Sequence, residues 1–183
     1  HGQHESFELK RKLTMHLVRE GGVRLVAYEA SSARALVCDE YVSGRSGDLN
    51  AAMKGFGMRI WLIEENAALL QDLRAWNAAA APADRVRFAG VDVQDAEAAA
   101  ARLHALLLPS EPDLAARAQP LGMRMEAARD ALYAGKAAEF DALWAEVEAL
   151  RAELQESHAA RARTGSSSVA EEVLQRGREL TRF

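Results

Sequence analysis

The sequence is poor in cysteine and contains no long apolar run, and both absences narrow the class of protein. Cys38 is the single cysteine, so the chain cannot form an internal disulfide or hold a metal in a cluster of thiolates. A reducing compartment suits such a chain, and we expect a cytoplasmic location. No apolar stretch approaches the roughly 20 residues that cross a bilayer, and no signal peptide is visible. We therefore expect no membrane partner.

An excess of positive charge is also missing. The chain carries 27 acidic and 23 basic side chains, for a net charge of -4. This balance lacks the basic signature of a polyanion-binding protein, and we expect no nucleic-acid partner. Apolar residues make up 49% of the chain, which is typical of a folded domain rather than a disordered segment.

Titratable side chains are concentrated at the start of the sequence. His1, His4 and Glu5 lie within five positions, and Glu29 follows at the end of a β-branched, apolar run. Histidine accepts a proton near pH 7, and a neighbouring carboxylate can orient its ring and support the resulting charge. One interpretation is a general base that activates water. The alternative is that these histidines are simply solvated at a chain terminus.

The first half of the sequence predicts alternating helices and strands. Residues 5–20 predict a helix with an apolar stripe, a feature that ordinarily faces a core. Its members are Leu9, Leu13 and Leu17, with Val18 beside them. Residues 23–28 and 85–92 predict buried strands, and residues 61–79 predict a long helix. Ligands collect beyond the carboxyl ends of strands in open α/β sheets, which is where Glu29 would emerge.

The second half is rich in Ala, Leu, Glu and Arg, and its pattern is helical. Residues 96–108 predict one helix. An apolar seam with spacings of three and four predicts another over residues 137–158, paired with residues 123–133 as an αα-hairpin. The predicted fold class is α/β, with a short, largely buried sheet flanked by helices and followed by a helical subdomain.

These patterns divide the chain into three parts. Residues 1–95 are expected to form the N-terminal half of an α/β catalytic core, which is incomplete at both ends. Residues 96–160 form a helical subdomain or insertion, and residues 161–183 a linker and C-terminal helix.

Four segments, in the same order and with plausible gaps, resemble the erythromycin esterase family. Residues 1–10 resemble its HG-x-HE-F pattern, and residues 26–29 resemble its strand ending in Glu. Residues 73–77 resemble its W-L-R-x-x-N helix end, and residues 86–94 resemble its R-F-x-G-x-D-x-Q strand.

The resemblance implies hydrolysis of an ester or lactone, a macrolide in the best-known members, by water activated at a histidine without a covalent acyl-enzyme. His1 matches the general base, and Glu29 matches the acid that orients the base or the water. Lys10 stands where the family often has Arg, so it keeps the charge but lacks the bidentate fork. We expect His4 and Glu5 to contact the substrate, with no metal and no cofactor. The implied role is macrolide inactivation, and hence antibiotic resistance.

Two other functions compete with this hypothesis. His1 and His4, three residues apart, could belong to a metal-dependent hydrolase, although the segment is not H-E-x-x-H and a catalytic zinc usually has three protein ligands. A non-catalytic fragment or small-molecule-binding relative is the other alternative. The family's later histidine element has no match before Phe183.

Overall fold

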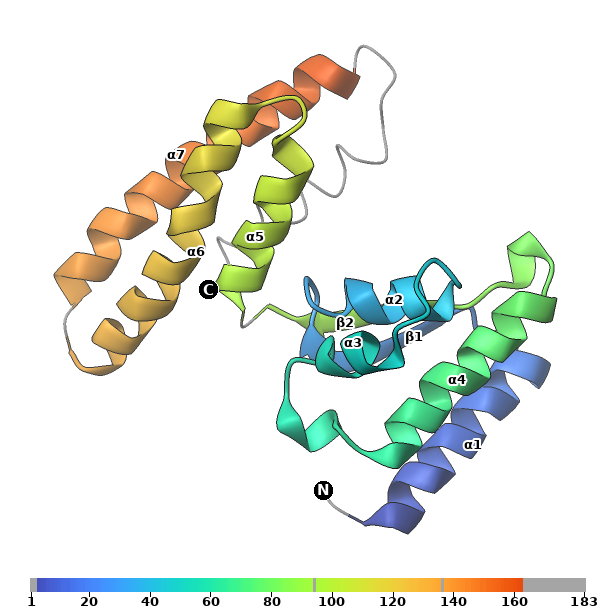
Figure 1. Cartoon of the computed structure of the whole chain (residues 1–183). Coiled ribbons are helices and arrows are strands. Elements are labelled where there is room, and N and C mark those ends of the chain that lie inside the picture. Colours follow the sequence, from blue (N-terminus) through green and yellow to red (C-terminus); the bar gives the residue numbers. More distant parts are fainter. Residues whose placement is uncertain (1–2, 94, 136, 163–183) are drawn as a thin grey trace. The chain divides into compact units, whose positions relative to one another are not determined.

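The computed structural model describes residues 3–93, 95–135 and 137–162 and divides into two compact units. Unit 1 comprises His1–Asp92 and unit 2 comprises Val93–Phe183. Unit 1 contains a small parallel sheet with helices, and the described part of unit 2 is helical (Figure 1). The predicted α/β class with a helical subdomain is therefore confirmed. The predicted C-terminal helix lies outside the described residues.

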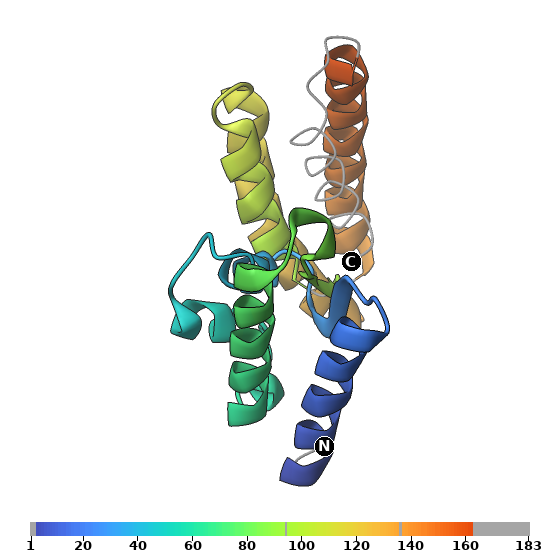
Figure 2. The ribbon, with the colours of Figure 1, turned by 90° about the vertical axis from the view of Figure 1, so that its right-hand side faces the viewer.

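Unit 1 alternates helices with two strands. In chain order its elements are α1 (His4–Glu20), β1 (Leu25–Ser31), α2 (Leu36–Val42), α3 (Leu49–Lys54), the 3-10 helix η1 (Arg59–Trp61), α4 (Glu64–Ala79), the 3-10 helix η2 (Pro82–Asp84) and β2 (Arg87–Asp92). Helices α1 and α4 run side by side (Figure 2). Gly22, with φ of 67°, adopts the left-handed conformation that ends α1 and turns the chain toward β1.

The sheet has one covered face and one open face. β1 and β2 are parallel, with Leu25 opposite Arg87 and Tyr28 opposite Gly90. Successive side chains in a strand point to opposite faces. Val26 and Phe88 are buried in the core, whereas Leu25 and Ala27 on the other face of β1 are exposed. Helices therefore cover only one face of this sheet within unit 1.

Helix α1 packs on the core with a different side from the leucine stripe. Phe7, Met15 and Val18 are its buried residues. The three leucines remain solvent-exposed: Leu9 at 66%, Leu13 at 53% and Leu17 at 42% of their surface. The helix was predicted correctly, but the stripe does not face the core of unit 1.

A buried carboxylate joins α2 to β2. Asp39 is 1% exposed and accepts hydrogen bonds from Arg87 Nε at 2.9 Å, the Phe88 amide at 2.9 Å and Arg45 at 3.0 Å. Burial alone would raise the pKa of Asp39, but the bonds from Arg87 and Phe88 and the arginine charges outweigh it. The pKa of Asp39 is consequently below its ordinary value.

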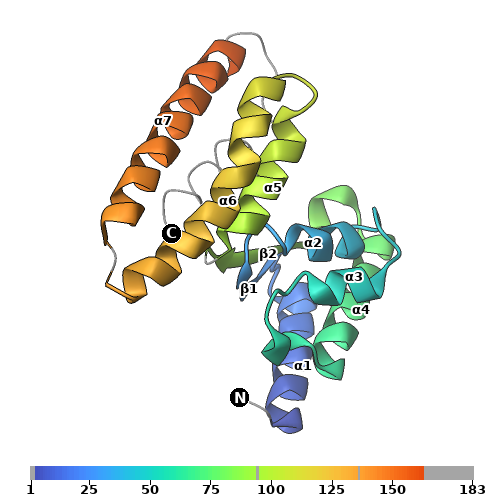
Figure 3. The same cartoon turned by 60° about the vertical axis from the view of Figure 1, so that its left-hand side comes forward.

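Unit 2 is built from three helices. They are α5 (Ala96–Leu107), α6 (Pro112–Tyr133) and α7 (Ala137–Ala162), with α6 packed against both neighbours (Figure 3). Leu143, Val147, Leu150 and Leu154 of the predicted α7 seam are buried. Asp95 caps α5 by accepting a hydrogen bond from the Ala98 amide at 2.8 Å. No helix among the described residues is both long enough and apolar enough to span a membrane.

Helix α6 is longer than predicted and passes close to α5. It begins at Pro112 and continues through Pro120, whereas the sequence predicted only residues 123–133. A Cβ added to Gly122 would lie 2.6 Å from the Cβ of Ala100 and 2.7 Å from the carbonyl of Ala96. Glycine at this position therefore lets the two helix backbones approach.

We predict that Asp39→Asn destabilises the protein by about 2–4 kcal/mol at pH 7, because it leaves buried donors poorly paired. The Asp39 contribution is fully present above the unfolded-state pKa of about 3.9 and is lost as pH falls through the lower folded-state pKa. Urea unfolding at several pH values measures this difference, which should shrink below about pH 4. The exposed Glu20→Gln variant serves as the control. Equal stability of wild type and Asp39→Asn at pH 7 would contradict the assignment.

Candidate active site

Strand β1 presents Glu29 on the open face of the sheet. Glu29 is exposed, while its neighbours Tyr28 and Ala30 turn toward the interior. The sequence predicted a buried strand over residues 23–28 with this carboxylate beyond its end, whereas Glu29 lies within β1, which continues to Ser31 and is exposed on one face. The carboxylate can therefore reach a ligand bound beside α1 and β1.

A depression of about 250 Å³ lies between α1 and β1 in unit 1. Its lining residues are Phe7, Lys10, Thr14, Ala27, Tyr28, Glu29 and Trp61. Glu29 and Lys10, which the sequence predicted as catalytic from separate segments, thus line the same depression. A carboxylate, an ammonium group and an aromatic wall are brought together here.

A chain of hydrogen bonds fixes the wall behind Glu29. Trp61 Nε1 donates to the Glu29 carbonyl at 2.7 Å. Asn66 is buried and donates to the Trp61 carbonyl at 2.9 Å, while its Oδ1 accepts from the Tyr28 hydroxyl at 3.0 Å. Through these three hydrogen bonds, Trp61 and Asn66 connect the end of β1 to the first turns of α4.

Aromatic rings complete this wall. The Trp61 ring makes edge-to-face contacts with Phe7 and Tyr28, at centroid distances of 6.2 and 5.6 Å. Lys10 places its Nζ 4.8 Å from the centre of the Phe7 ring, a cation–π contact. Burial raises the pKa of Tyr28 to about 12, so its phenol stays protonated at neutral pH. The single phenolic proton is donated to Asn66 Oδ1.

Of the two N-terminal histidines, His1 lies outside the described residues and His4 lies within them. His4, in the first turn of α1, hydrogen-bonds through Nδ1 to Glu65 of α4. That hydrogen bond and the charge of Glu65 raise the pKa of His4 above 6.5. His4 and Glu5 are both exposed, and neither is among the residues that line the depression.

The thiol of Cys38 and a metal site are the other two candidates for a reactive centre. Cys38 is buried, and desolvation raises the pKa of its thiol to about 12, which keeps it in the unreactive protonated form. Within the described residues, no group of three or more His, Cys, Asp or Glu side chains could hold a metal ion.

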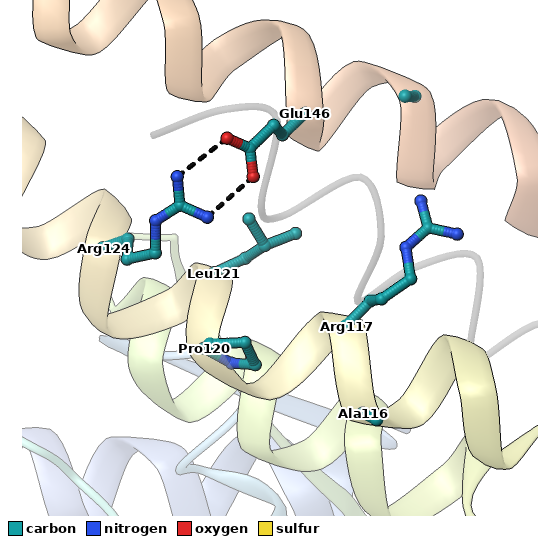
Figure 4. A pocket seen from close by; sticks show the side chains of 7 residues that line it. Ala116, Arg117, Pro120, Leu121, Arg124 and Glu146 are labelled. Atoms are coloured by element: carbon teal, nitrogen blue, oxygen red, sulfur yellow. Dashed lines mark hydrogen bonds and ion pairs between the residues drawn. The ribbon is translucent and has the colours of Figure 1, made fainter.

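A second cavity, of about 330 Å³, lies between α6 and α7 in unit 2 (Figure 4). Arg124 is paired with Glu146 through two hydrogen bonds of 2.7 and 2.8 Å. Arg117 makes the equivalent pair with Glu153 at 2.6 and 2.8 Å. Both guanidinium groups already have carboxylate partners, and we interpret the cavity as a groove between packed helices.

Sequence comparison identifies the family. Residues 18–181 match the profile described as erythromycin esterase, which extends through both units. The chain belongs to the erythromycin esterase family. The match begins after the N-terminal motif, so the role of His1 still rests on the resemblance of residues 1–10.

Solved structures share the erythromycin esterase fold of this chain. A Bacillus cereus protein aligns with a TM-score of 0.79 and 21% identity, over 100% of this chain and 44% of that one. A succinoglycan biosynthesis protein aligns with a TM-score of 0.62 and 17% identity, over 96% of this chain and 44% of its own. At these identities the likeness establishes the fold alone. This chain spans less than half the length of either protein, and no curated protein matches it.

Sequence reasoning missed the residues that hold the site of this erythromycin esterase family member in place. Asn66 lies on the apolar side of α4, three and four residues before the buried Leu69 and Leu70. Its partners, Tyr28 and Trp61, are 38 and 5 residues away. A polar residue on the apolar side of α4 was the available signal.

We predict that His4 titrates above 6.5 and that Glu65→Gln returns its pKa toward 6.5, because the substitution removes the acceptor charge. NMR titration of the imidazole resonances measures both values. The raised pKa of His4 means that the pair stabilises the fold below pH 6.5 while Glu65 is ionised, and that this contribution is lost as pH rises through the pKa of His4. It is also lost at low pH, as pH falls through the lowered pKa of Glu65. The neighbouring Glu64→Gln variant should leave the titration unchanged. A His4 pKa that is the same with and without Glu65 would disprove the pairing.

Proposed function

We propose that this chain forms part of an ester hydrolase that cleaves an ester or lactone with an activated water molecule. Membership of a family named for ester hydrolysis supports the reaction class. The observation that carries the proposal is that Glu29 and Lys10 line one depression with an aromatic wall. The same depression on a non-catalytic relative would bind the substrate without turning it over.

The carboxylate of Glu29 orients the attacking water or the protonated base. An exposed carboxylate on a fixed strand is suited to this role, since the Trp61 and Asn66 hydrogen bonds hold the backbone of that strand. In this mechanism His1 takes the proton from water, which attacks the ester carbonyl directly. No covalent bond to the enzyme forms.

Lys10 stabilises the negative charge that develops on the carbonyl oxygen. Lys10 lines the depression from α1, whereas Glu29 lines it from β1. A single charge can stabilise an oxyanion, but without the planar fork of arginine it constrains orientation less. His4 and Glu5 contact the part of the substrate that extends along the start of α1.

The substrate we propose is larger than the depression. Pockets that enclose drug-sized ligands usually measure about 300–1,000 Å³, so a depression of about 250 Å³ would hold the ester group and its immediate neighbours. The rings of Phe7, Tyr28 and Trp61 would pack against an apolar ring system such as that of a macrolide. The proposed enzyme inactivates macrolides in the cytoplasm. This inactivation would give resistance to the antibiotic.

We predict that Glu29→Gln lowers kcat for ester hydrolysis by about 100-fold or more, because water activation loses its carboxylate. The melting temperature should change little, since Glu29 is exposed. A screen of the whole protein against macrolides and simple aryl esters supplies the assay, with Glu20→Gln as the matched control. Normal turnover with a large fall in melting temperature would assign Glu29 a structural role instead.

Replacement of His1 by alanine should abolish ester hydrolysis and leave folding intact, because the general base is then absent. The control is His16→Ala, which removes an exposed imidazole from the middle of α1. Steady-state kinetics and circular dichroism separate the two effects. Unchanged turnover in His1→Ala would remove this residue from the mechanism. Loss of activity on chelation, restored by added zinc, would favour the metal-dependent alternative.

A further inference from the structure

Thr14 brings a hydroxyl group to the depression between α1 and β1, and the mechanism proposed above does not use it. Thr14 lines the depression together with Lys10 and Glu29. It is half-buried, whereas the side chains of Lys10 and Glu29 are exposed. A polar group that lines a pocket fixes the orientation of a ligand and helps to determine which ligand binds.

Within the described residues, the hydroxyl of Thr14 has no hydrogen-bond partner. Threonine in the middle of a helix commonly donates its hydroxyl proton to a backbone carbonyl one turn earlier. That carbonyl belongs to Lys10, and no such bond forms in α1. The hydroxyl is therefore available to donate a hydrogen bond to a ligand in the depression.

Lys10 supplies a second donor beside it. Lys10 and Thr14 are four residues apart in α1, so they lie on one side of the helix with their Cβ atoms about 5–6 Å apart. In the part of the chain that the structure describes, the Lys10 ammonium has no carboxylate partner, and it lies 4.8 Å from the centre of the Phe7 ring. An ammonium and a hydroxyl one helical turn apart can donate to the same oxygen atom.

The two donors complement each other. A lysine ammonium is a mobile point charge on a flexible stem, so it attracts an oxygen without fixing its direction. The threonine hydroxyl is held close to the helix backbone, and the stiff χ1 angle of a β-branched side chain limits its positions. A hydrogen bond from Thr14 therefore supplies the geometric constraint that Lys10 lacks.

Glu29 limits the kind of oxygen that suits this pair. Its carboxylate lines the same depression from β1, and like charges repel most strongly where solvent is partly excluded. A ligand that arrives with a full negative charge is disfavoured, whereas a neutral carbonyl group is not. Donors act most strongly on such a group when charge develops on its oxygen during the reaction.

We propose that Thr14 and Lys10 form a two-donor subsite for one acceptor oxygen of the substrate. The identity of that atom rests on the ester hydrolysis proposed above, in which it is the carbonyl oxygen. Attack by water moves the π electron pair of the carbonyl onto this oxygen, and both donors stabilise the resulting oxyanion. The carbonyl then re-forms as the C–O bond to the alcohol breaks, and the alcohol leaves with the proton taken from water. Thr14 keeps its own proton throughout.

Thr14→Val removes the hydroxyl but keeps a β-branched side chain of similar size, so the helix should remain intact. We expect kcat for 4-nitrophenyl acetate to fall by about 10–100-fold, since the loss of one oxyanion donor has effects of this order. Thr14→Ser keeps the hydroxyl and should restore most of the activity. The melting temperatures of both variants, followed by circular dichroism, should match that of the wild type.

Binding of phenylphosphonate tests the subsite without any turnover, because its tetrahedral oxygens resemble those of the reaction intermediate. The measurement is made by NMR titration in the Glu29→Gln background, which removes the carboxylate that would repel the probe. Thr14→Val and Lys10→Gln should each weaken the Kd by about 10-fold, because each removes a hydrogen bond to a charged acceptor. Lys12→Gln removes an exposed cation of α1 that does not line the depression, and should leave the Kd unchanged.

The outcomes separate this proposal from ester hydrolysis itself. A Kd that is the same with and without the Thr14 hydroxyl would overturn the subsite, as would a failure of Glu29→Gln to bind phenylphosphonate. Equal losses in Thr14→Val and Thr14→Ser would assign Thr14 a packing role and also overturn it. Binding that depends on the hydroxyl, in a protein that hydrolyses no ester, would support the subsite and refute the proposed reaction.

Discussion

The arrangement of unit 1 depends on the pairing of β1 with β2, and the buried carboxylate of Asp39 holds β2 in place for that pairing. Asp39 accepts from the Phe88 amide and from Arg87, so one side chain fixes both the backbone and a charged group of β2. β1 then pairs in register, with Tyr28 opposite Gly90. A Cβ on Gly90 would lie 2.4 Å from the Ala30 carbonyl, so glycine is required where the strands approach. Glu29 lies where this register shifts, between Tyr28 and Ser31, and the Trp61 hydrogen bond holds its carbonyl.

The sequence allowed the α/β class and the helical second half to be predicted, because each follows from a local pattern. Glycine stops, alternating strands and helical periodicity all act over a few residues. Asn66 was missed because its two partners become its neighbours only in the folded chain. Helix α6 was predicted too short because Pro120 ordinarily interrupts a helix. Burial of Ala118, Leu121 and Met125 around it offsets the lost hydrogen bond.

The leucine stripe of α1 shows a different limit of sequence reasoning. Its periodicity correctly indicated an apolar surface, but periodicity cannot say which polypeptide packs on that surface. Phe7, Met15 and Val18 face the core of unit 1 instead. The helix thus has two apolar sides, and Lys10 and Thr14 lie between them on the depression.

The central claim is that the depression between α1 and β1 binds the scissile ester. A crystal structure of the whole protein with a lactam analogue, in which an amide replaces the hydrolysable ester, tests it most directly. We expect the amide carbonyl within hydrogen-bond distance of Lys10 Nζ, with a water molecule on the Glu29 carboxylate. We also expect the ring system of the analogue against Phe7, Tyr28 and Trp61. An analogue bound with both Lys10 and Glu29 beyond hydrogen-bond reach would show that the ester is cleaved elsewhere.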